Sequence, residues 1–174
     1  GAGRVAVRGV AGEARRLFGV DGGSPLGPFA TLVDRGADPL QSYVGVRKLG
    51  YWGEGFAVLP ASPHPCAERA HAVLRSAVAR MQAGEHCAGL ACGIGQEGLP
   101  LHPITTELAG NAIGLAHEEH PVISAGCDDA IEPGGVYSLR VDLSDPRGHA
   151  IVSAMVAVHE QGNEVLWSSR EPAR

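Results

Sequence analysis

Several features that would assign the sequence to a familiar class are missing. No block of Lys and Arg stands out among its 14 basic and 19 acidic residues, and the formal net charge of −5 disfavours a nucleic-acid partner. No apolar run approaches the roughly 18–20 residues of a transmembrane helix. The first ten residues, GAGRVAVRGV, lack the charged-then-apolar layout of a secretory signal. We therefore expect a cytoplasmic protein with no nucleic-acid and no membrane partner.

The four cysteines form no C-x-x-C pair, and Cys87 and Cys92 stand five residues apart. This spacing fits neither a zinc knuckle nor a redox pair. Because free cysteine is among the most buried residue types, we expect reduced, partly buried thiols. The 25 glycines and 12 prolines are spread along the chain, which predicts many turns between short elements.

Two segments rich in Val, Tyr, Trp and Phe, residues 41–49 and 51–59, predict a pair of strands. Alternation places Glu54 on the same face as Trp52 and Phe56. A single carboxylate among apolar neighbours is the unusual feature of this strand.

Apolar residues at helical spacing predict a helix that begins near Pro65 and ends before Gly84, followed by a shorter one over 87–92. Residues 136–143 alternate as a half-buried strand, and residues 151–158 are almost wholly apolar. A turn at 161–163 then predicts a C-terminal hairpin. Strands, helices and strands in this order indicate an α+β fold.

The first 28 residues are poorly readable, and residues 29–34 predict a further strand. We expect a single domain over 29–174, a size that can bury a substantial core.

The densest polar cluster is His117-Glu118-Glu119-His120. Its histidines are three apart rather than the four of H-E-x-x-H, and Pro121 disfavours a continuing helix, so we expect a polar surface loop. Gly93-x-Gly95-x-x-Gly98 matches a dinucleotide motif in letters, but it follows no strand and opens no helix. Residue chemistry alone therefore reveals no active site.

Several ordered segments resemble the pita-bread metallopeptidases, the family of methionine aminopeptidase, prolidase, aminopeptidase P and creatinase. Residues 110–115 (GNAIGL) and 118–123 (EEHPVI) resemble its GHGIGLxVHExPxI stretch, and 133–139 (PGGVYSL) resembles PGMVFTI. Residues 45–56 and 151–166 resemble two further family strands. The resemblance implies a pita-bread fold from about Phe29 to Leu166. The family's early helix is not evident, which implies a shortened N-terminal side.

The resemblance also implies a dinuclear metal site of two Asp, one His and two Glu. This sequence departs from that ligand set at nearly every position. Only Glu54, eleven residues after the position of the first Asp, keeps a carboxylate. The five positions are held by Tyr43, Glu54, Asn111, Arg140 and Ser153.

We expect no metal and no other cofactor, because Arg140 is a permanent cation where a dication would lie. Our hypothesis is that Glu54 and Arg140 form a buried ion pair, with Tyr43, Asn111 and Ser153 as hydrogen-bond partners in a binding pocket.

The leading interpretation is a noncatalytic pita-bread domain that binds a peptide, a small molecule or a protein partner. One alternative is a metal-independent, creatinase-like hydrolase or lyase that uses Glu54, His117 and Glu118. Another is a degenerate Xaa-Pro peptidase that needs a partner chain. The resemblance also implies that a homodimer can form, although no residue specifies its surface.

Overall fold

The computed structural model describes residues 40–59, 64–96, 109–145 and 148–169. These ranges hold strands, then two helices, then strands, which confirms the α+β prediction. Residues 1–28 and the strand expected over 29–34 lie outside the described residues. The domain limits of 29–174 therefore stay a prediction.

The two strands predicted first form an antiparallel hairpin, β1 (Leu40–Lys48) and β2 (Tyr51–Leu59). The turn between them has two residues, Leu49 and Gly50, with φ angles of 53° and 92°. Two consecutive positive φ angles match the twist of antiparallel strands, as in a type I′ turn. The backbone register then places Glu54 opposite Gly45.

The helix predicted after Pro65 is α3 (Pro65–Arg80), with proline in its first turn, where the missing N–H is no loss. Ala70, Val73, Leu74 and Ala77 lie on its buried face. The second helix, α4 (Cys87–Gln96), runs four residues beyond the predicted end. Neither of these two helices of the described chain is long and apolar enough to cross a membrane.

The remaining strands form one antiparallel sheet in the order β4-β3-β5-β6-β7. The outer pair at one edge is β3 (Gly110–Ala112) and β4 (Glu119–Ile123), and the middle strand is β5 (Val136–Asp145). The predicted C-terminal hairpin is confirmed by β6 (Gly148–His159) and β7 (Gly162–Ser168). The polar loop predicted over 117–120 is wrong at its end, because Glu119 already belongs to β4.

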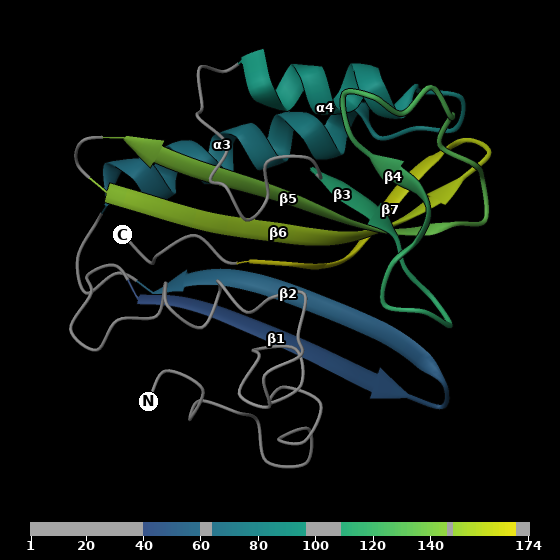
Figure 1. The fold of residues 1–174 in the computed structure, drawn as a ribbon, viewed down its shortest axis with the longest axis horizontal. Helices are drawn as coiled ribbons and strands as arrows, with labels where there is room; N and C mark the ends of the chain where they lie inside the picture. Colours follow the sequence, from purple (N-terminus) through teal and green to yellow (C-terminus); the bar gives the residue numbers. More distant parts are fainter. Residues whose placement is uncertain (1–39, 60–63, 97–108, 146–147, 170–174) are drawn as a thin grey trace.

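The elements stack in three layers, with α3 and α4 on one face of the five-stranded sheet and the β1–β2 hairpin on the other (Figure 1). Alternation along β5 sends Leu139 and Val141 into the apolar core beneath the helices. Ser138 and Arg140 therefore point to the opposite face, toward the hairpin. The fold thus encloses a second, polar interface between hairpin and sheet.

Candidate functional site

The interface between hairpin and sheet buries polar side chains from four strands. Glu54 on β2 is 4% exposed, and Asn111, Ser138 and Ser153 on the facing sheet are also buried. Burying a polar group costs free energy unless it has a hydrogen-bond partner or an opposite charge, so we follow the contacts of each of these side chains in turn.

Glu54 and Arg140 form the predicted ion pair. Arg140 Nη2 lies 3.7 Å from Glu54 Oε1, and the two side chains are 10% and 0% exposed. The Arg140 guanidinium also lies 5.8 Å from the centre of the Phe56 ring. Phe56, two residues after Glu54, therefore helps to shield the pair from water, which strengthens its attraction.

Two further side chains satisfy the Glu54 carboxylate. The Ser138 hydroxyl donates to Oε1 over 2.5 Å, and His117 Nε2 lies 2.9 Å from Oε2. The His117 ring in turn meets the Trp52 ring edge to face, with centres 5.5 Å apart. Both carboxylate oxygens are thus engaged by neighbouring groups.

Asn111 closes the network into a ring. Its Oδ1 accepts a hydrogen bond from Arg140 Nη2, while its Nδ2 donates to the carbonyls of Ala112 (2.8 Å) and His117 (3.2 Å). Contacts therefore run from Glu54 through Arg140, Asn111 and His117 back to Glu54. Such a closed circuit fixes the orientation of every member.

The surroundings of Glu54 shift its acidity strongly. Burial alone would raise the pKa, but the Arg140 guanidinium, the His117 ring and the Ser138 hydroxyl lower the pKa of Glu54 from 4.5 to about 2. At neutral pH Glu54 is a carboxylate and a very weak base. A general base works best when its pKa lies near the working pH, so this side chain is poorly suited to proton transfer.

The structure brings some of the predicted site residues together and separates others. Ser153 does not bond to the ion pair as expected; its hydroxyl accepts from the Phe56 N–H over 2.8 Å and ties β6 to β2. The backbone of Tyr43 pairs with that of Phe56, but its side chain lies outside the described residues. Glu118, named with Glu54 and His117 as an alternative catalytic group, is exposed.

Ser138 was not predicted as a partner of the pair. His117 was grouped with Glu54 only as an alternative catalytic residue, and the structure does bring these two side chains together. Ser138 could have been found, because it shares the polar face of β5 with Arg140. His117 carries no such signal, since it lies in a loop whose path depends on tertiary contacts.

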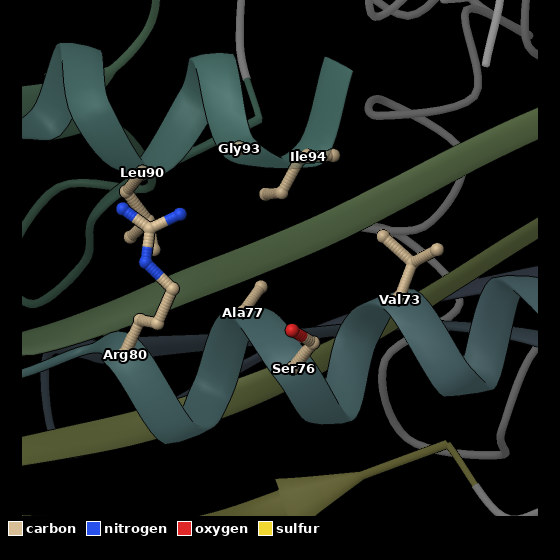
Figure 2. A pocket seen from close by; sticks show the side chains of 7 residues that line it. All are labelled: Val73, Ser76, Ala77, Arg80, Leu90, Gly93 and Ile94. Atoms are coloured by element: carbon tan, nitrogen blue, oxygen red, sulfur yellow. The ribbon is translucent and has the colours of Figure 1, made fainter. Parts of the chain in front are cut away.

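A separate cavity of about 380 Å³ lies between α3 and α4 (Figure 2). It is lined by Val73, Ser76, Ala77, Arg80, Leu90, Gly93 and Ile94. Arg80 reaches across it, pairs with Glu85 just before α4 (2.6 Å) and donates to the Gly89 carbonyl within α4 (3.3 Å). No residue of the ion-pair cluster lines this cavity, so the two features are independent.

No group of three or more His, Cys, Asp or Glu side chains suited to hold a metal ion occurs within residues 40–59, 64–96, 109–145 and 148–169.

No family model and no curated protein matches the sequence. Solved structures do match. One is the dipeptidase PepE of Mycobacterium ulcerans, with a TM-score of 0.62 and 23% identity over 76% of this chain and 38% of that chain. Another is the prolidase of Pyrococcus furiosus, with a TM-score of 0.65 and 18% identity over 76% of this chain and 42% of that chain. The N-terminal domain of the FACT complex subunit SPT16 from chickpea also matches, with a TM-score of 0.58 and 14% identity over 72% of this chain and 34% of that chain.

The chain therefore spans about two fifths of the length of the peptidases that it matches. At these identities the likeness concerns the fold. The likeness covers 76% of this chain at TM-scores of 0.62 and 0.65, so this protein has the pita-bread fold of those peptidases.

Proposed function

We propose that the chain is a noncatalytic pita-bread domain with a binding role, in which the Arg140 guanidinium takes the place of metal charge beside Glu54. The single observation that supports this most is the 3.7 Å contact between the two side chains. A cation that already compensates the carboxylate leaves little charge with which to attract a metal ion.

The donor set does not fit the dinuclear centre that the fold family implies. Divalent metals need several carboxylate or imidazole ligands, whereas the five corresponding positions offer a phenol, a carboxylate, an amide, a guanidinium and a hydroxyl. Two unit charges about 4 Å apart interact by roughly 4 kcal/mol at an effective dielectric constant of 20, and a dication beside Arg140 would meet about twice that repulsion. We derive no metal-dependent step for this chain.

The network also argues for a binding role. A closed hydrogen-bond circuit holds the interface between the hairpin and the sheet rigid, and a preorganised protein binds a ligand with less loss of entropy. The likeness to a domain of the FACT complex subunit SPT16 adds support, because that domain belongs to a subunit of a larger assembly. We propose a peptide, a small molecule or a protein as the ligand.

The experiment combines metal analysis with a hydrolysis screen. The purified chain is equilibrated with Mn²⁺, Co²⁺ or Zn²⁺, dialysed, and analysed for bound metal; it is then incubated with Xaa-Pro dipeptides and methionyl peptides. We expect no stoichiometric metal and no hydrolysis, while a prolidase treated in parallel shows both. One equivalent of metal held with micromolar affinity would overturn the proposal.

A second candidate is a metal-independent hydrolase or lyase, favoured by the 2.9 Å contact between His117 and Glu54. In that case His117 is the acid or base, and Glu54 only orients its ring. Turnover of a carbonyl substrate that disappears in a folded His117→Gln variant would support this candidate over the first.

A further inference from the structure

The cavity between α3 and α4 has the size and the lining of a small-molecule site. Its volume of about 380 Å³ lies within the range of ligand pockets, roughly 300–1,000 Å³. Packed helices normally leave few voids larger than a water molecule, so a space of this size is unusual. Its apolar walls are four buried residues, two from each helix: Val73, Ala77, Leu90 and Ile94.

Arg80 brings a positive charge to one side of this cavity. Among the lining residues that the structure describes, it is the only charged one. Its Nη2 donates to Glu85 and to the Gly89 carbonyl, and neither of these residues lines the cavity. Its Nη1 lies against Gly93 in the cavity wall, and no described residue accepts a hydrogen bond from it (Figure 2). The contacts of Nη2 thus orient the guanidinium so that Nη1 is presented to the cavity.

Gly93 supplies the room for this guanidinium. It lies inside α4, where glycine is less stable than alanine because its backbone loses more freedom. A Cβ at Gly93 would collide with Arg80 Nη1. The pair of Arg80 with Glu85 is partly exposed, and such pairs add about as little stability as a helical glycine costs. Stability alone therefore does not account for glycine and arginine at these two positions, whereas a ligand held by Nη1 does.

We infer that this cavity binds a small monocarboxylate with a short apolar body. The carboxylate accepts a charge-assisted hydrogen bond from Arg80 Nη1. The Ser76 hydroxyl, four residues before Arg80 on the same helix face, donates to the carboxylate as well. The apolar body lies against the walls of both helices. Glu85 already offsets part of the charge of Arg80, so a single carboxylate fits better than a dianion.

This site goes beyond the proposed function and does not depend on it, because no residue of the ion-pair cluster lines the cavity. The probe is hexanoate, titrated into the full ¹⁵N-labelled chain and followed by NMR. We expect saturable shifts of the amide signals of α3 and α4, and none around Arg140. Hexanamide has the same shape without the charge and should bind about tenfold more weakly. Acetate, which lacks the apolar body, and inorganic phosphate, which carries more charge, should also bind more weakly than hexanoate.

Two variants test the residues that hold the ligand. Arg80→Met removes the guanidinium, so it should weaken hexanoate binding about tenfold and leave hexanamide binding nearly unchanged. Gly93→Ala displaces Nη1 and should weaken hexanoate binding by a similar factor, without a lower melting temperature, because alanine favours the helix. Gly95→Ala is the matched control on α4, since a Cβ there would meet no atom within 4 Å. It should leave the affinity unchanged.

Several results would overturn this inference. They are shifts that do not saturate, shifts centred on the ion-pair cluster, or affinity for hexanamide, acetate or phosphate equal to that for hexanoate. Unchanged hexanoate affinity in Arg80→Met would do the same. A lower melting temperature of Gly93→Ala with unchanged affinity would mean that Gly93 serves packing alone, against the inference. None of these readouts involves metal or hydrolysis, so the inference and the proposed function can fail separately.

Discussion

Replacing Arg140 with methionine removes the cation of the buried pair while keeping a long side chain beside Phe56. In the native protein the pKa of Glu54 drops from 4.5 to about 2. At roughly 1.4 kcal/mol per pH unit, this drop corresponds to about 3 kcal/mol of stability at pH 7. Breaking a buried pair from one side costs about 3–5 kcal/mol in general. We therefore expect Arg140→Met to lower the free energy of unfolding by about 3 kcal/mol.

The assay is urea unfolding at pH 7, followed by circular dichroism, in a double-mutant cycle with Glu54→Gln. The double variant should regain part of the loss, because it no longer buries an unpaired carboxylate. Arg80→Met is the matched control. Its ion pair with Glu85 is shorter, at 2.6 Å, but the two side chains are 45% and 31% exposed, so we expect a loss of at most about 1 kcal/mol.

Two results would refute this reasoning. One is that Arg140→Met costs no more than Arg80→Met, which would mean that the buried contact is energetically no different from the exposed one. The other is strict additivity of Arg140→Met and Glu54→Gln. If Arg140→Met fails to fold, Arg140→Lys keeps the charge and should recover part of the stability.

Three further predictions concern pH, packing and thiol reactivity. Because the native pKa of Glu54 is lowered, its contribution to stability is complete above about pH 5 and is lost as the pH falls toward 2. Between these pH values the free energy of unfolding should therefore fall less steeply in Glu54→Gln than in the native protein. A Cβ at Gly55 would lie 2.6 Å from the Trp167 ring, so Gly55→Ala should shift the tryptophan emission to the red and lower the free energy of unfolding by about 1–3 kcal/mol. Gly126→Ala is the control, because a Cβ there meets open space, and it should change neither quantity. Equal effects of the two substitutions would contradict this packing. Among the four thiols, exposed Cys92 should react first with a disulfide reagent and the buried three only on unfolding; rapid reaction of more than one thiol would contradict the burial.

Most of the described fold could be predicted because its periodicity is strong. The alternation over 136–143 predicts a strand, and the helical spacing after Pro65 predicts a helix. Both predictions are confirmed, by β5 and by α3. The elements β3 and β4 could not be predicted in the same way. They are short, and β4 contains Pro121, which local patterns assign to a loop; pairing with neighbouring strands overrides this preference.

The ion pair could be predicted because the family resemblance puts Glu54 and Arg140 at two positions of one metal site. Glu54 lies between Trp52 and Phe56, and Arg140 alternates with buried residues of β5. The hydrogen bonds around the pair were harder to predict, since they depend on side-chain orientation across two layers. Ser153 therefore bonds to the backbone of Phe56 rather than to the pair.

The most direct test of the central claim is diffraction from crystals grown with Mn²⁺, with data collected so that manganese scatters anomalously. We predict the Arg140 guanidinium within about 4 Å of the Glu54 carboxylate, the range of an ion pair, and no anomalous peak beside them. Two anomalous peaks bridged by Glu54, with Arg140 turned away, would contradict the account.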